Sequence, residues 1–278
     1  MTADPDAVGG LRIRHVHPRG SGRTPLVLLH GFTGSGESWG GDLLEGLSEI
    51  GPLLVVDLPG HGQSRALNPL DPEAPPRFEE VVGALAAIPA AFGYPRAHWI
   101  GYSMGGRLAM AVAIESPDVV SRLVLEGASP GLATEYERAE RRRADAALAD
   151  RIVDEGIEAF VTFWMDLPLF ESQKRMSGSK REAMRRIRMR NDPHALAAVL
   201  RGMGTGRQPS YWDELPDLMH PVLIVTGALD TKFEAIALQM RRRLPRGERA
   251  SLPGAGHTTH LETPATWLES VRGFLNGD

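Results

Sequence analysis

The short stretch Trp99–Arg107 places the strongest constraint on what this chain can fold into. Its centre, Gly101-Tyr102-Ser103-Met104-Gly105, has the pattern G-x-S-x-G, which is typical of a serine on a sharp turn between a strand and a helix. Small residues are needed on both sides because such a turn leaves no room for side chains. The residues before the turn are strand-like, and those after it have helical spacing. Glycine-rich turns are common, so the rest of the chain decides whether Ser103 is catalytic.

Strand-like and helical segments alternate along most of the chain. The expected strands are 11–16, 25–29, 53–57, 98–100, 123–125, 222–226 and 249–252, and the expected helices are 39–50, 78–90, 107–113, 233–244 and 264–276. Several of the strands are short apolar runs, as strands covered on both faces are. This alternation predicts an α/β fold with a mostly parallel, doubly wound sheet. The Pro-rich segment 68–76 is expected to be a surface loop.

The segment from 133 to 215 interrupts the alternation. It carries no strand signal and is rich in charged residues, and its helix breakers are Pro168, Ser177-Gly178-Ser179, Pro193 and Gly202–Pro209. An all-helical insertion after the expected strand 123–125 predicts a lid over the carboxyl edge of the sheet, where such sheets bind ligands. We therefore divide the chain into an α/β core, residues 1–132 and 216–278, and a helical lid, residues 133–215.

Composition narrows the classes of function. With 278 residues, 42% of them hydrophobic, the chain suits one large domain with an insertion. It has no cysteine, which excludes disulfides and thiolate metal sites, and its net charge of −4 gives no reason to expect nucleic acid as a partner. No apolar run reaches the roughly 18 residues of a membrane helix, and residues 1–10 do not have the pattern of a secretory signal. We expect a cytoplasmic enzyme, a monomer or weak homo-oligomer, with no membrane partner.

Three polar residues each follow an expected strand, in the order Ser103, Asp230, His257. This order of serine, acid and histidine is that of the α/β-hydrolase fold. Serine by itself is a poor nucleophile or base, so a histidine must take its proton and a carboxylate must orient that histidine. The backbone amides of Phe32 and Met104 are the expected oxyanion hole, because one follows an earlier strand and the other follows the serine.

Each of these residues also has a simpler interpretation. Asp230 could cap the helix that follows it, His257 could be an ordinary loop histidine, and Phe32 could belong to the core. Their coincidence at the ends of the right strands favours a catalytic triad. We interpret His61 as structural. The H-x-x-H spacing of His257 and His260 has no further sign of a metal site beside it, so no metal is expected.

Seven local strings make a more specific comparison possible. They are His30–Gly34, Gly101–Arg107, Glu126–Leu132, Trp164 with Pro168–Phe170, Gly202–Trp212, Asp230–Phe233 and Gly254–His260. In these strings and their order, the chain resembles the 2-succinyl-6-hydroxy-2,4-cyclohexadiene-1-carboxylate synthases, enzymes of menaquinone biosynthesis with the α/β-hydrolase fold. The resemblance covers nearly all of the chain. The first and last strings are common in α/β-hydrolases, whereas the elbow ending in Arg107 and the lid strings are more specific. The main departure is Tyr211, where leucine is commoner.

The resemblance implies a carbon–oxygen lyase that eliminates pyruvate from 2-succinyl-5-enolpyruvyl-6-hydroxy-3-cyclohexene-1-carboxylate. In that reaction Ser103, hydrogen-bonded to His257, would act as a base and not as an acylated nucleophile. The amides of Phe32 and Met104 would stabilise the developing oxyanion. No metal or organic cofactor is implied.

A substrate with several carboxylates needs fixed cations, preferably the planar forks of arginine. The residues that the resemblance assigns to the substrate are Arg107, Tyr102, Arg141, Trp164 and Arg188. Arg138, one helical turn before Arg141, is an alternative anchor because the neighbouring arginines leave the register open. Of the 31 basic residues 28 are arginine, so a solvated helix face competes as an interpretation of each lid arginine, and Trp164 could be lid core.

Two other functions are compatible with the same triad. One is a serine hydrolase of the same fold, either a carboxylesterase or a carbon–carbon bond hydrolase, since fold does not fix function. The lid arginines favour an anionic substrate over a fatty ester. The other is an inactive hydrolase fold used as a binding module, which the complete triad disfavours.

Overall fold

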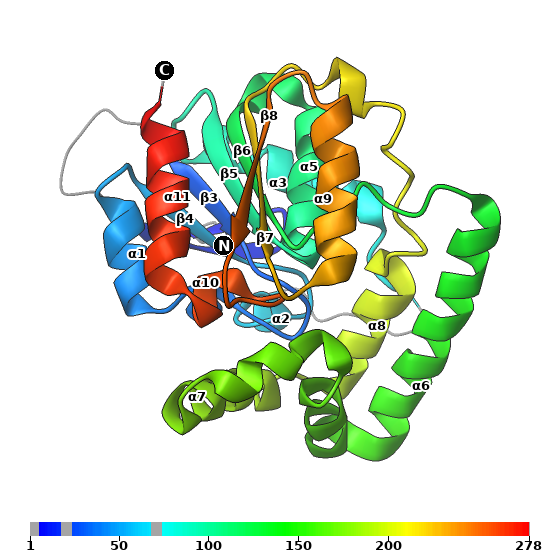
Figure 1. The fold of residues 1–278 in the computed structure, drawn as a ribbon. Coiled ribbons are helices and arrows are strands. Elements are labelled where there is room, and N and C mark those ends of the chain that lie inside the picture. The colour runs from blue at the N-terminus through cyan, green and yellow to red at the C-terminus, as the bar shows by residue number, and fades with distance from the viewer. Residues whose placement is uncertain (1–5, 18–23, 68–73, 278) are drawn as a thin grey trace.

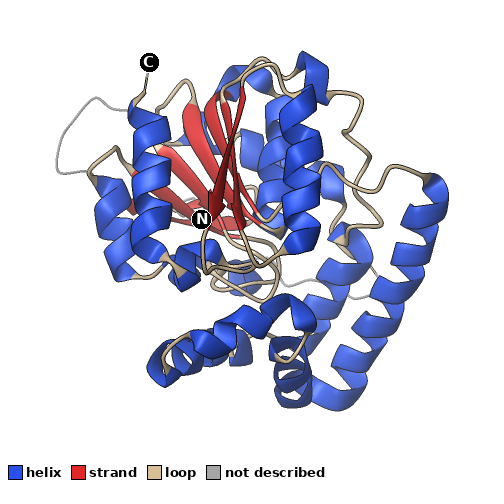
Figure 2. Cartoon of the chain, in the orientation of Figure 1, coloured by secondary structure: helices blue, strands red, loops and turns tan. Residues whose placement is uncertain are grey.

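A computed structural model describes residues 6–17, 24–67 and 74–277. Its centre is an eight-stranded sheet in the order β1-β2-β4-β3-β5-β6-β7-β8, with helices on both faces (Figures 1 and 2). The strands are β1 Ala7–Val8, β2 Leu11–Val16, β3 Leu26–Leu29, β4 Leu53–Asp57, β5 Ala97–Tyr102, β6 Val120–Glu126, β7 Val222–Gly227 and β8 Gly247–Leu252. The β1–β2 and β2–β4 pairs are antiparallel and the others are parallel. The predicted α/β-hydrolase architecture, with its mostly parallel sheet, is confirmed.

Two apolar layers enclose the sheet. Helices α3 Phe78–Ala86, α5 Met104–Glu115 and α9 Thr231–Arg243 cover one face, whereas α1 Gly41–Ser48 and α11 Pro264–Asn276 lie together on the other (Figure 1). Strands β3 and β7 are buried along their whole length, which explains why their sequences are continuous apolar runs. The sheet therefore forms a rigid platform for the loops that follow its strands.

Most expected elements are present, but some boundaries differ. The expected helix 78–90 is divided into α3 and α4 Ile88–Ala91, because Pro89 lacks an N–H group and its ring would clash with the carbonyl of Leu85. The helix expected from residue 39 begins at Gly41, after a 3₁₀ turn, η1 Gly36–Trp39. Residues 68–73 of the expected Pro-rich loop lie outside the described residues. Short elements that the sequence did not indicate are α2 Ser64–Leu67, η2 Pro117–Val119, η4 Leu215–Asp217 and α10 Thr259–Glu262.

Between β6 and β7 the described chain is helical and contains no strand. Its elements are α6 Glu135–Met165, η3 Pro168–Arg175, α7 Gly178–Met189 and α8 Pro193–Met203. Helices α6 and α8 share an apolar core of their own, and Figure 1 shows them beside the sheet, with α7 reaching below it. An interruption at Gly156, where φ is +77°, was not expected from the sequence. The domain limits at 132/133 and 215/216 stay predictions.

Candidate active site

Ser103 lies on the sharp turn between β5 and α5. Its backbone torsions, φ 51° and ψ −107°, are rare for a residue with a side chain and mark local strain. A Cβ atom on Gly101 would lie 2.4 Å from the carbonyl oxygen of Gly105, and one on Gly105 would lie 2.2 Å from that of Leu29. The turn therefore requires both glycines, as the sequence pattern predicts. The Ser103 N–H donates to the carbonyl oxygen of Glu126 at 2.8 Å, which fixes the turn against β6.

Ser103, His257 and Asp230 form a continuous hydrogen-bonded chain. His257 Nε2 lies 3.3 Å from Ser103 Oγ, and His257 Nδ1 lies 2.7 Å from Asp230 Oδ2. The other carboxylate oxygen of Asp230 accepts the N–H of Phe233 at 3.2 Å and caps α9. Both interpretations of Asp230 therefore hold, because its two oxygens bind different partners. The geometry suits a serine whose proton passes to a histidine oriented by a buried carboxylate.

Phe32 and Met104, the predicted oxyanion-hole residues, line the same cavity as Ser103. Met104 opens α5, so its N–H belongs to the first helical turn, which has no acceptor within the helix. Phe32 follows β3 and lines the same cavity. In the described part of the chain neither N–H has an acceptor. Both groups are thus free to donate to an oxygen of a bound molecule, and their role as an oxyanion hole stays a prediction.

A cavity of about 230 Å³, which we call the chamber, opens beside Ser103. Two members of the triad, Ser103 and His257, line it. Four of the five predicted substrate residues line it as well, namely Tyr102, Arg107, Arg141 and Trp164. Residues from α5 and α9, from the loops after β3, β6 and β8, and from α6 and α8 all contribute. The chamber thus lies between the sheet and the helical segment, where doubly wound sheets bind ligands.

Arg107 projects from α5 into the chamber and is only 8% exposed. Its Nη1 donates to Gln208 Oε1 at 3.0 Å, and its Nη2 donates to the carbonyl oxygen of Met203 at 3.1 Å. Neither partner carries a charge. Burial, with a contribution from nearby Arg141, lowers the pKa of Arg107 to about 10, so the side chain is still protonated at neutral pH. A buried cation with neutral partners is suited to bind a carboxylate.

Arg141, and not Arg138, is the α6 arginine that reaches the chamber. Arg141 lines the cavity and donates from Nε to Asp145 Oδ1 at 2.7 Å. Arg138 instead donates to Glu135 at 3.0 Å and to the carbonyl oxygen of Leu132 at 2.9 Å, and it is absent from the chamber lining. Of the two alternatives that the sequence left open, only Arg141 lines the chamber, and its role as a substrate anchor stays a prediction.

Tyr102 and Trp164 are aromatic residues in the lining of the chamber. The Tyr102 hydroxyl hydrogen-bonds Thr258 Oγ1 at 2.7 Å, and burial raises the pKa of this hydroxyl. The Trp164 ring packs edge-on against Phe32, with 5.4 Å between the ring centroids, while its buried Nε1 has no partner in the described residues. Trp164 is thus both lid core and chamber wall.

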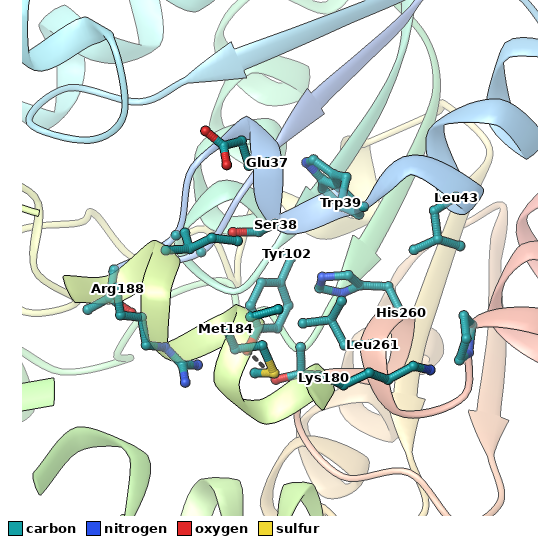
Figure 3. Close-up of a pocket in the computed structure, with 18 of the residues that line it drawn as sticks. Glu37, Ser38, Trp39, Leu43, Tyr102, Lys180, Met184, Arg188, His260 and Leu261 are labelled. Atoms are coloured by element: carbon teal, nitrogen blue, oxygen red, sulfur yellow. Dashed lines mark hydrogen bonds between the residues drawn. The ribbon is translucent and has the colours of Figure 1, made fainter. Parts of the chain in front are cut away.

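Arg188 lies in a second cavity, of about 280 Å³, next to the chamber (Figure 3). The two cavities share Tyr102, Phe32 and Phe170 as walls. The guanidinium of Arg188 stands 5.3 Å from the centre of the Phe170 ring, and its buried Nη1 has no partner in the described residues. The structure therefore does not place Arg188 in the same cavity as Ser103. The aromatic residues shared by the two cavities lie between them.

Sequence reasoning missed a buried cluster behind the elbow. The fully buried carboxylate of Glu126 accepts hydrogen bonds from Thr259 Oγ1 at 2.7 Å and from the His260 N–H at 3.0 Å, and it lies 2.9 Å from His260 Nδ1. Because its carbonyl oxygen also binds the Ser103 N–H, Glu126 links the elbow to the segment that follows His257. The only sequence signal was an acidic residue ending an apolar strand. Gln208, the partner of Arg107, gave no signal, since only the fold brings it to α5.

The remaining histidines of this region are structural. His61 Nε2 accepts the Thr33 N–H at 3.2 Å and His30 Nε2 accepts the Leu58 N–H at 3.0 Å. Burial lowers the pKa of His30 to about 4 and that of His61 to about 3, so both are neutral. Among the described residues no group of three or more His, Asp or Glu side chains could hold a metal ion, and no helix there is long and apolar enough to cross a bilayer.

Comparison with known proteins places the chain in a family. The family described as the alpha/beta hydrolase fold matches residues 24–264, and the chain belongs to this family. A candidate 2-succinyl-6-hydroxy-2,4-cyclohexadiene-1-carboxylate synthase of Bacillus subtilis is 42% identical over 250 residues, 90% of this chain and 89% of the relative. The synthase of that name from Pectobacterium atrosepticum is 37% identical, over 90% and 93%. MenH from S. aureus superposes with a TM-score of 0.89 at 32% identity, over 95% and 97%. Within the α/β-hydrolases the chain thus belongs with these synthases.

Proposed function

We propose that this protein is a 2-succinyl-6-hydroxy-2,4-cyclohexadiene-1-carboxylate synthase. Its reaction is the elimination of pyruvate from 2-succinyl-5-enolpyruvyl-6-hydroxy-3-cyclohexene-1-carboxylate, a step of menaquinone biosynthesis. Similarity over nine-tenths of the chain to relatives that bear this name supports the proposal. We also propose that the reaction takes place in the cytoplasm, whose reducing conditions suit a sequence without cysteine.

The triad can supply the base for this elimination. Ser103 Oγ takes the proton from ring carbon C2, which is acidic because it adjoins the succinyl ketone, and passes its own hydroxyl proton to His257 Nε2. The released electron pair forms the C2–C3 double bond, the C3–C4 double bond moves to C4–C5, and the C5–O bond breaks. The departing enolpyruvate takes the proton from His257 and becomes pyruvate. Charge that develops on the ketone oxygen is stabilised by the N–H groups of Phe32 and Met104.

The observation that carries the proposal over a generic hydrolase is Arg107. It lies one helical turn after Ser103, is buried, and has only neutral partners. A guanidinium held in this way binds a carboxylate within reach of the base, whereas it would disfavour a neutral ester. Arg141 supplies a second cation in the chamber, and Arg188 in the adjoining cavity supplies a third for a substrate part that extends past Tyr102.

Pyruvate release tests the proposal directly. Purified protein given the enolpyruvyl substrate should release pyruvate, measured with lactate dehydrogenase, faster than the spontaneous decay of the substrate. No release above that decay would contradict the proposed function. Rapid cleavage of neutral p-nitrophenyl esters, together with an acyl group on Ser103 detected by mass spectrometry, would instead favour the serine hydrolase.

A further inference from the structure

Asp145 is a buried carboxylate of α6 that the triad chemistry does not use. It is 4% exposed, although most surface helices keep their carboxylates in water. Its Oδ1 accepts Nε of Arg141 at 2.7 Å, and its Oδ2 has no partner in the described residues. Asp145 itself does not line the chamber, whereas Arg141 does. Any effect of Asp145 on a bound molecule therefore passes through Arg141.

The way in which Asp145 holds Arg141 leaves the arginine fork available. The contact uses Nε, and neither Nη atom of Arg141 has a partner in the described residues. Those two Nη atoms are the pair that binds a carboxylate side-on. Arg141 is 41% exposed, so without a second contact its long side chain would be free to turn to solvent. Asp145 thus fixes the stem of the arginine and directs its free end.

The surroundings of Asp145 hold the carboxylate itself in place. A Cβ atom on Gly204 would lie 2.3 Å from Asp145 Oδ2. The loop after α8 therefore comes so close to this carboxylate that any residue other than glycine would clash with it. The same loop region carries Met203 and Gln208, which bind Arg107. The charge of Asp145 also raises the pKa of Arg107, whereas burial and Arg141 lower it. The carboxylate of Asp145 therefore binds Arg141 directly and acts on Arg107 only through its charge.

We infer that Asp145 is a positioning residue that aims Arg141 at a substrate carboxylate and partly balances the charge of the two chamber arginines. This inference rests on the proposed function for the identity of the substrate. With Asp145 in place, two guanidinium groups face the chamber against one buried carboxylate, which leaves an excess positive charge for a polyanionic substrate.

The test combines single and double variants in the pyruvate assay. Asp145→Ala should raise KM about tenfold and change kcat little, because a charge-assisted contact that orients a binding group is lost. Asp145→Asn, which keeps an oxygen acceptor for Arg141 Nε, should raise KM less. Arg141→Ala should also raise KM, and adding Asp145→Ala to it should have no further effect, because Asp145 acts through Arg141.

Glu155→Ala is the matched control. Arg151 and Glu155 form the same contact on the same helix, from Nε to a carboxylate four residues later at 2.8 Å, but both side chains are about 40% exposed there, at 39% and 41%. This control should leave KM unchanged. The inference would be overturned if KM were unchanged in both Asp145→Asn and Asp145→Ala. It would also be overturned if the rise in KM of the double variant equalled the product of the rises in Asp145→Ala and Arg141→Ala. Should Asp145→Ala not fold, the Asn variant alone decides.

Binding of tricarballylate separates this inference from the proposed function. Its dissociation constant, measured by calorimetry, should rise severalfold in Asp145→Ala and remain unchanged in Glu155→Ala. If the wild type releases no pyruvate but shows this binding pattern, the proposed reaction fails and the positioning role stands. If the wild type releases pyruvate and both variants bind tricarballylate equally well, the positioning role fails and the reaction stands.

Discussion

The two walls of the chamber differ in how their polar groups are satisfied. On the sheet side, Ser103, His257 and Asp230 bind one another and their neighbouring backbone. On the helical side, buried polar atoms without a partner in the described residues occur at Asp145 and Trp164, and also at Arg188 in the adjoining cavity. An unpaired buried polar group costs about 1–3 kcal/mol. The triad of the sheet wall is therefore paired without substrate, and only the N–H groups of Phe32 and Met104 there await an acceptor, whereas Trp164 on the helical wall and Arg188 beside it keep buried donors without a partner in the described residues.

Removing the base is the strongest test of the sheet wall. Ser103→Ala should lower kcat for pyruvate release by about 10²–10⁴-fold, the usual contribution of a positioned acid–base group. KM should change little, because the arginines that bind the substrate are untouched. Initial rates at saturating substrate measure this. A variant that keeps more than roughly a tenth of the wild-type kcat would show that Ser103 is not the base.

The cluster behind the elbow should matter for stability. Glu126→Ala leaves His260 without its buried partner, so unfolding in urea should show a loss of about 3–5 kcal/mol. Burial acts to raise the pKa of Glu126, but the charge of His260 and the donated hydrogen bonds outweigh it and lower the pKa below the usual value.

This lowered pKa fixes the sign of the pH dependence. A carboxylate whose pKa is lower in the folded state stabilises the fold above its ordinary pKa of about 4.3 and loses that contribution as the pH falls below it. The difference in unfolding free energy between wild type and Glu126→Gln should therefore be largest at pH 7 and shrink at pH 4. A difference that does not depend on pH would contradict the ionised state of Glu126.

Arg107 joins the two walls, since it starts on α5 and binds both the last residue of α8, Met203, and Gln208 in the loop after it. Arg107→Ala should lower kcat/KM about 10²-fold, because a charge-assisted contact in a buried site is lost. Arg107→Lys should restore little of this, since a lysine cannot reproduce the planar fork. The exposed Arg143 on α6 provides a control, and Arg143→Ala should behave like wild type in the same assay. Full activity of Arg107→Lys would indicate that only the charge matters.

The sequence predicted the elements of the sheet wall better than the side-chain contacts of the helical wall, because the former depend on neighbours along the chain. The elbow depends on glycines that are neighbours along the chain, and α11 has the bounds that its apolar spacing predicts. By contrast, Arg107 binds Gln208 from 101 residues away, and even on the sheet side Glu126 binds His260 from 134 residues away. Such contacts leave no local pattern, and neither does the placement of Arg188 beyond Tyr102. Pro89 indicates a break in the expected helix 78–90, but the apolar spacing of these residues continues across the break and favoured a single helix.

The smallest expected effect sharpens the assignment of the α6 arginines. Arg138 donates hydrogen bonds to Glu135 and to the carbonyl oxygen of Leu132, both near the start of α6. Because such partly exposed ion pairs contribute about 0–1 kcal/mol, Arg138→Ala should change KM by less than about twofold, against the larger rise expected for Arg141→Ala. An equal rise in both variants would mean that the helix start, and not one guanidinium, determines substrate binding. With the expected pattern, the distinction narrows to individual side chains: Arg107 and Arg141, which line the chamber, bind the substrate, whereas Arg138, which does not line it, holds the start of α6.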